Sequence, residues 1–196
     1  MISISLSRSI QRASFAVLTA LAALAAQVSL AAPSSFSVSV PGTPDGAAFD
    51  TAVGSNRAGC GGANVSPAVS WSNLPAGTNS LAITFWDVDA QKGAGMVQWV
   101  HYGIPASVPG VPAGFAGSAT AGHEGTNGRG EAAYAGPCPP ATDAAHHYVI
   151  QVFALDISPS ELEAGLSRAQ LTTKMASHVL ASASVFEHYG SSSGAH

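Results

Sequence analysis

The chain carries few charged side chains. Asp, Glu, Lys and Arg make up 9% of its 196 residues, and only seven residues are Lys or Arg. Proteins that bind the phosphate backbone of nucleic acids gather basic residues on one face, and so small a number predicts no nucleic-acid partner. The same shortage argues against broad adhesion to anionic membranes, although a single lipid head group can still enter a pocket.

Long apolar runs are also scarce, and the one clear run lies at the N-terminus. Arg8 and Arg12 precede an apolar stretch over residues 15–24, and Ser29-Leu30-Ala31 supplies the small residues that a signal peptidase reads. The stretch is too short for a spanning helix, and no second one follows, so no transmembrane segment is predicted. We expect a signal peptide over residues 1–31; the alternative is a retained N-terminal anchor.

Cleavage after residue 31 removes two of the seven basic residues and none of the eleven acidic ones, which leaves a net charge of −6 with neutral histidines. About 165 residues then remain, a length that suits one domain with a real core. We expect this domain over residues 32–190, followed by a disordered tail over residues 191–196. Low charge with many Gly, Pro, Ser and Ala residues indicates a turn-rich protein that is mainly β.

Short apolar or alternating segments predict the strands. They lie at residues 35–40, 69–71, 81–86, 97–104 and 148–155. The long segment between residues 106 and 145 is rich in small and polar residues. A loop of this length is expected only where contacts or cross-links hold it in place or where it has a function.

Two capping patterns predict helix starts near the C-terminus. Ser158-Pro159-Ser160-Glu161 has proline in the first turn, and Ser167 with Gln170 completes a capping box for a helix that ends near Ser177. Residues 179–189 fit either a continued helix or a final strand, and their Ser and β-branched content favours the strand.

The two cysteines lie in loops rich in glycine and proline. Cys60 is flanked by Gly59 and Gly61, and Cys138 lies between Pro137 and Pro139. Two cysteines in an exported chain predict a disulfide that ties these loops together. A catalytic thiol is the alternative, whereas two cysteines alone do not make a zinc site.

Polar side chains gather in three short blocks: Asp87-Val88-Asp89, the proline turn with Pro139 and Pro140, and His146-His147-Tyr148. Carboxylates one residue apart on a strand point to the same face. If the blocks meet, they enclose a small polar pocket for an anionic or zwitterionic head group. Asp87 can equally cap a strand end.

Several segments share their residues and order with a known family. They are Cys60-Gly61-Gly62-Ala63-Asn64-Val65-Ser66-Pro67, Trp71 through Pro75-Ala76-Gly77, Asp87-Val88-Asp89-Ala90, Trp99 through Ile104-Pro105-Ala106, Asn127 with Tyr134, the block from Gly136 to Pro140, His146-His147-Tyr148, and His178-Val179-Leu180-Ala181. Together they resemble the phosphatidylethanolamine-binding protein family, in particular its bacterial Raf kinase inhibitor-like branch.

The resemblance implies an antiparallel β-sandwich with a few peripheral helices and one shallow anion-binding pocket at a sheet end. Carried over by position, it implies a set of ligand-binding residues: Asp87, Asp89, Pro139, Pro140, His146 and Tyr148, with Tyr189 at the mouth.

The chain departs from the family pattern at four places. Val88 and Gln91 replace prolines, so the turn after Asp87 is less rigid. His147 stands where arginine is usual. Gln98 stands at the position of a family histidine and joins the predicted ligand-binding set, whereas His101 is expected on the opposite strand face, as a packed or a surface residue and not as a ligand. A neutral amide gains no charge at mildly acid pH, so we expect weaker and less pH-dependent anion binding.

Together these observations predict an exported, non-enzymatic binding protein, periplasmic or secreted, with no cofactor and no bound metal. Its ligand is a phosphate or a phosphoethanolamine head group, with the carboxylates engaged by backbone N–H groups or by His146. One alternative is a module that inhibits a protease or kinase through the pocket rim and the loop over residues 108–129. A less favoured alternative is a metal-dependent hydrolase that uses Asp87, Asp89, His146 and His147, although no serine sits in a strand–turn–helix nucleophile elbow and no His-Glu-x-x-His run is present.

Overall fold

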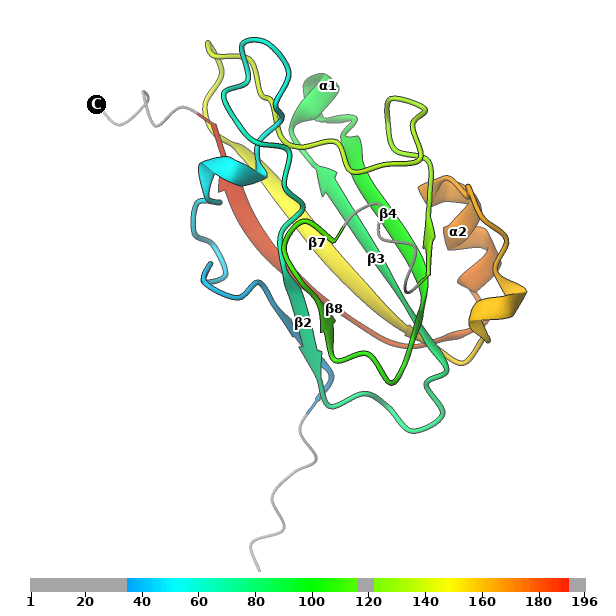
Figure 1. Ribbon diagram of the computed structural model, residues 1–196. Helices are drawn as coiled ribbons and strands as arrows, with labels where there is room; N and C mark the ends of the chain where they lie inside the picture. Colours follow the sequence, from blue (N-terminus) through cyan, green and yellow to red (C-terminus); the bar gives the residue numbers. More distant parts are fainter. Residues whose placement is uncertain (1–34, 116–121, 191–196) are drawn as a thin grey trace, which may run out of the picture. The chain divides into compact units, whose positions relative to one another are not determined.

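The computed structural model of the protein describes residues 35–115 and 122–190 (Figure 1). The predicted signal peptide over residues 1–31 and the predicted tail over residues 191–196 lie outside the described residues. Part of the loop expected to contact a protein partner, residues 116–121, also lies outside them.

Two antiparallel sheets form the described domain. The larger sheet has the order β6–β4–β3–β7–β8, and the smaller one has the order β1–β2–β5. The strands of the larger sheet are β3 (Ser80–Asp87), β4 (Met96–Pro105), β6 (His123–Glu124), β7 (His146–Leu155) and β8 (Val179–Tyr189). Those of the smaller sheet are β1 (Ser37–Ser39), β2 (Val69–Ser72) and β5 (Gly110–Val111). The predicted antiparallel β-sandwich is therefore confirmed.

The main core fills the space between the two sheets. Trp71 from the smaller sheet packs in one cluster with Phe85, Trp99, Tyr148 and Ile150 from the larger sheet. Strand β3 is buried on both faces along most of its length, as its apolar sequence predicts. These side chains form one continuous apolar layer between the two sheets, and the burial of this layer stabilises the fold.

Helical segments cover the other face of the larger sheet. Leu171 and Met175 of α2 (Arg168–Met175) pack with Ala82, Val100 and Tyr102 of that sheet. Figure 1 shows α2 beside β4, on the face turned away from β2. The other helical segments are short: α1 (Ala90–Gly93) and the 3₁₀ helices η1 (Thr51–Val53) and η2 (Pro159–Glu161).

Both predicted helix starts are confirmed. Ser167 accepts a hydrogen bond from the Gln170 N–H, and the Gln170 side chain returns to the Ser167 backbone. Ser158 and Glu161 form the same box, although the helix that follows is only a 3₁₀ turn. The segment that fitted either a helix or a strand is the strand β8, as its Ser and β-branched content favoured.

A β-bulge interrupts strand β4. Trp86 pairs with Val97 and Phe85 pairs with Trp99, so Gln98 has no partner of its own on β3. His101 pairs with Ile83, stacks on the Trp99 ring and is fully buried, so the expectation of a packed His101 is confirmed. Simple alternation, which assigned Gln98 and His101 to opposite faces, does not apply across the bulge.

The predicted disulfide is confirmed. Cys60 and Cys138 form a bond with a Cα–Cα distance of 5.2 Å, which rules out a free catalytic thiol at either position. Beside the bond, the Ser55 N–H donates to the Pro137 carbonyl, and a Cβ atom on Gly136 would lie 2.5 Å from the Val53 carbonyl oxygen. Only glycine permits this close approach of the two loops.

Candidate functional site

A row of polar side chains crosses one end of the larger sheet. Asp87 of β3 lies opposite Tyr148 of β7, and Tyr148 lies opposite Glu187 of β8. All three side chains are buried, although two of them carry carboxylates. Buried polar groups of this kind need partners or a ligand, because leaving them unpaired in an apolar layer is costly.

Asp87 both ends its strand and holds a histidine. Its Oδ1 accepts the backbone N–H groups of Asp89 and Ala90, each at 3.0 Å. Its Oδ2 lies 2.9 Å from His146 Nδ1. The carboxylate is therefore engaged by backbone donors and by His146, as expected, and it fixes the orientation of the imidazole ring.

His146 lies between two carboxylates. Its Nδ1 faces Asp87, and its Nε2 lies 3.5 Å from Oδ2 of Asp143. Burial lowers the pKa of His146, but the hydrogen bonds and charges of Asp87 and Asp143 outweigh that effect, and the pKa is raised above its usual value. The ring is thereby biased towards imidazolium. We call Asp87, Asp143, His146 and Tyr148 the His146 cluster.

Asp143 was not predicted from the sequence. It reaches His146 because the loop turns back: the Asp143 N–H donates to the carbonyl of Pro140 at 3.0 Å. Pro140 therefore contributes to the cluster by beginning the turn that brings Asp143 to His146. The only sequence signal was a carboxylate three residues before a histidine, which is not specific.

Asp89 does not join the cluster. The strand ends at Asp87, and Asp89 adopts a helical backbone conformation, with φ −91° and ψ −21°. Its Oδ2 accepts the backbone N–H of His147 at 2.6 Å and lies 2.9 Å from His147 Nδ1, on the exposed side. These hydrogen bonds lower the pKa of Asp89. The strand alternation from which a common face was predicted does not reach Asp89, because β3 ends at Asp87. The charges of Asp89 and His146 still act on each other, and a ligand contact from Asp89 stays a prediction.

Two buried polar atoms of predicted site residues have no hydrogen-bond partner among the described residues. They are Oε1 of Gln98 and the hydroxyl of Tyr148. Burial raises the pKa of Tyr148, and the nearby charge of Asp87 adds to the effect, so the phenol keeps its proton. The Tyr148 hydroxyl thus lies close enough to Asp87 for that carboxylate to act on it, without a hydrogen bond of good geometry.

The remaining predicted residues lie at the edge of the cluster. The position of a Cβ atom on Gly190 would be 3.1 Å from Cγ of Pro139, so Pro139 lies against the end of β8. The hydroxyl of Tyr189 donates to the Thr51 carbonyl at 3.4 Å, which joins this side chain to the first residue of η1. A ligand contact from either residue stays a prediction.

Glu187 is a second residue that the sequence reading missed. It is 2% exposed, and neither carboxylate oxygen has a hydrogen-bond partner among the described residues. Burial, with a smaller contribution from the charge of Asp45, raises its pKa to about 7. Alternation in β8 places Glu187 on the same face as buried Val185, which the final assignment of that segment as a strand would have revealed.

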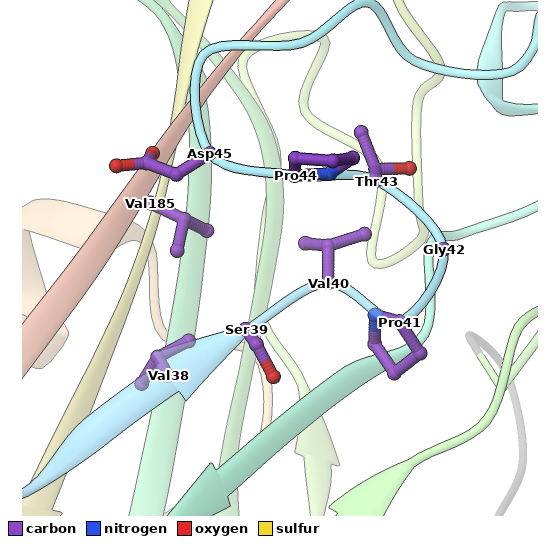
Figure 2. Close-up of a pocket in the computed structure, with 9 residues that line it drawn as sticks. All are labelled: Val38, Ser39, Val40, Pro41, Gly42, Thr43, Pro44, Asp45 and Val185. Carbon is purple, nitrogen blue, oxygen red and sulfur yellow. The ribbon is translucent and has the colours of Figure 1, made fainter.

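The structure also contains a hollow of about 470 Å³ beside β1 (Figure 2). It is lined by residues 38–45 and by Val185 of β8, and its one charged side chain is Asp45. None of the predicted ligand-binding residues lines it. The hollow and the His146 cluster therefore have no residue in common.

Within residues 35–115 and 122–190, no group of three or more His, Cys, Asp or Glu side chains is arranged to hold a metal ion. Over the same residues, no helix has the length and apolar character needed to cross a membrane.

Comparison with known proteins identifies relatives across most of the chain. The model of the family described as phosphatidylethanolamine-binding protein matches residues 42–190. The UPF0098 protein YbcL of Escherichia coli is 35% identical over 136 residues, which cover 67% of this chain and 74% of YbcL. The UPF0098 protein YbhB of the same organism is 36% identical over 134 residues, covering 66% of this chain and 84% of YbhB.

Solved structures agree with these matches. The crystal structure of E. coli YbcL, described as a new member of the mammalian PEBP family, has a TM-score of 0.73 and 31% identity, and covers 80% of this chain and 98% of that one. A putative phosphatidylethanolamine-binding protein homologue from Chlamydia trachomatis has a TM-score of 0.68 and 26% identity, covering 80% and 97%.

A putative lipoprotein, LppC of Mycobacterium tuberculosis, is 38% identical over 100 residues, which are 50% of this chain and 47% of LppC. Similarity to a lipoprotein and a disulfide bond both indicate a compartment outside the cytoplasm. The family match, the sequence identities and the shared fold lead to one conclusion: the chain belongs to the phosphatidylethanolamine-binding protein family.

Proposed function

We propose that the protein is a non-enzymatic binding protein of the periplasm or the extracellular space whose ligand is a small phosphorylated molecule of the phosphate or phosphoethanolamine type. The proposed pocket is built on the His146 cluster, with Gln98 beside it and Pro139 at its edge. The observation that carries the proposal is a buried imidazole held by a buried carboxylate, Asp87, at 2.9 Å.

Charge supports an anionic group on the ligand. Asp87 orients His146 and raises the pKa of the imidazole against the opposing effect of burial, so the ring is biased towards the positively charged form in a region where water is largely excluded. A phosphate oxygen that approaches Nε2 meets a charge-assisted donor, which is a stronger partner than a neutral one.

The unused polar atoms support a ligand with both donors and acceptors. The Tyr148 hydroxyl and the amide N–H groups of Gln98 can donate to phosphate oxygens. An ammonium group supplies a donor for an exposed carboxylate such as that of Asp143. Phosphoethanolamine therefore satisfies more of the site than phosphate alone.

The absence of a recognisable nucleophile or metal motif in the sequence favours binding over catalysis. Inhibition of a protease or kinase through the loop over residues 108–129 stays an alternative prediction, and immobilised full-length protein offered to such enzymes tests it.

Isothermal titration calorimetry with phosphoethanolamine, on the wild type and two matched variants, tests the proposal. His146→Gln removes the cationic ring of the cluster. His178→Gln removes an exposed ring that pairs with a different carboxylate, Asp156, at 2.7 Å. We expect loss of binding by about tenfold or more in the first variant, because a charge-assisted hydrogen bond is removed, and no change in the second. Equal affinity in both variants would refute the proposed pocket.

A further inference from the structure

We propose that Asp143 determines the selectivity of the pocket, because its carboxylate occupies the face of His146 that an anionic ligand needs and later receives the ligand's ammonium group. This inference rests on the proposed function. It assigns to one side chain a role that favours a zwitterionic ligand over a plain anion.

The two carboxylates on His146 differ in how they are held. Asp87 is buried and makes three contacts, two of them with backbone N–H groups. Asp143 lies on the solvent side, with its side chain 47% exposed, whereas the side chain of His146 is 10% exposed. A ligand that arrives from solvent therefore meets Asp143 first, at the one ring nitrogen that Asp87 leaves available.

Asp143 is also easy to displace. Its backbone is fixed by the turn from Pro140, and its carboxylate accepts a 3.3 Å hydrogen bond from the exposed Thr142 hydroxyl besides the 3.5 Å contact with His146. This contact is longer than the 2.9 Å contact of Asp87, and the Asp143 carboxylate is partly solvated, so it is the weaker of the two. The side chain can rotate away from Nε2 without loss of a backbone hydrogen bond, and the ring stays in place because Asp87 holds it.

Displacement of the Asp143 side chain leaves its negative charge at the rim of the pocket. Because the Asp143 backbone does not move, the carboxylate remains within a few ångströms of any phosphate bound to His146. A plain phosphate is repelled by this charge. A phosphoethanolamine molecule compensates for it, because its ammonium group can pair with the displaced carboxylate.

No other carboxylate near His146 fits this role. Asp87 is buried, and its three contacts hold it in place. Asp89 is exposed, but its Oδ2 already accepts the backbone N–H of His147 and pairs with the ring of that residue. Asp143 alone combines an exposed carboxylate with a direct contact to the ring.

The test is calorimetry with inorganic phosphate and with phosphoethanolamine on the full chain and on the Asp143→Asn variant. We expect roughly tenfold tighter phosphate binding in the variant, because the competing charge is removed, and weaker or unchanged phosphoethanolamine binding. The preference for phosphoethanolamine then falls by about tenfold or more. The control Asp156→Asn removes an equally exposed carboxylate from another histidine and leaves both affinities unchanged.

A measurement without ligand helps to distinguish a failure of this inference from a failure of the proposed function. NMR titration of His146 should give a lower pKa in Asp143→Asn than in the wild type, since one of the two carboxylates on the ring is neutralised. An unchanged pKa refutes the contact. An unchanged preference between the two ligands refutes only the role of Asp143, whereas the absence of binding in both proteins refutes the proposed function and this inference with it.

Discussion

Glu187 makes the stability of the protein depend on pH. The carboxylate is buried without a hydrogen-bond partner among the described residues, and its pKa rises from an ordinary 4.5 to about 7. The folded protein therefore binds this proton more tightly than the unfolded chain does. Stability from this group is fully present below pH 4.5, falls as the pH rises towards 7, and stays low above it.

Substitution of Glu187 by Gln keeps the shape and removes the charge. Each pKa unit corresponds to about 1.4 kcal/mol, so the raised pKa costs the wild type roughly 3 kcal/mol at pH 8. Glu187→Gln should recover most of this, an increase of about 6–10 °C in Tm for a domain of this size. At pH 4.5 and below, the two proteins should be nearly equal in stability, because Glu187 is protonated there.

Urea and thermal denaturation between pH 4.5 and 8, with the disulfide intact, measure this effect. The difference between wild type and variant isolates Glu187 from the histidines, which titrate in both proteins. Glu131→Gln is a suitable control, because Glu131 is exposed and pairs with Arg57 at the surface. A Glu187→Gln protein with the same pH profile as the wild type would show that the carboxylate finds a partner or water in the folded state.

Two further predictions concern the disulfide and the bulge. Replacement of both Cys60 and Cys138 by Ser should lower the unfolding free energy by about 4 kcal/mol, because the bond closes a long loop in the unfolded chain; denaturation with a stability equal to that of the wild type would contradict this. Gln98→His should make phosphate binding tighter at pH 5.5 than at pH 8, because the new ring gains a charge; calorimetry at the two pH values that shows no difference would remove Gln98 from the pocket.

The sequence predicted the sandwich well because the features that specify it are local. The apolar run at residues 81–86 gives the doubly buried strand β3, and Ser167 with Gln170 gives the start of α2. The disulfide followed from the cellular compartment and from the number of cysteines. Each of these patterns is contained within a few residues or in a simple count.

The site was predicted less completely, because it depends on where local structure ends. Asp89 lies beyond the strand on which the sequence placed it, because β3 stops two residues earlier, and Gln98 lies at a bulge that no alternation pattern indicates. Asp143 reaches His146 only through a turn in a long loop. Glu187 became a candidate site residue only once the pairing of β7 with β8 was known, because this pairing places Glu187 opposite Tyr148.

The most direct test of the central claim is NMR of the histidine side chains during titration with phosphoethanolamine. We predict that the Nε2 resonance of His146 changes its chemical shift with the same dissociation constant that calorimetry gives, while the resonances of the His178 ring do not change. Chemical-shift changes confined to residues 38–45 and Val185, around the hollow in Figure 2, with the His146 resonances unchanged, would refute the proposed pocket.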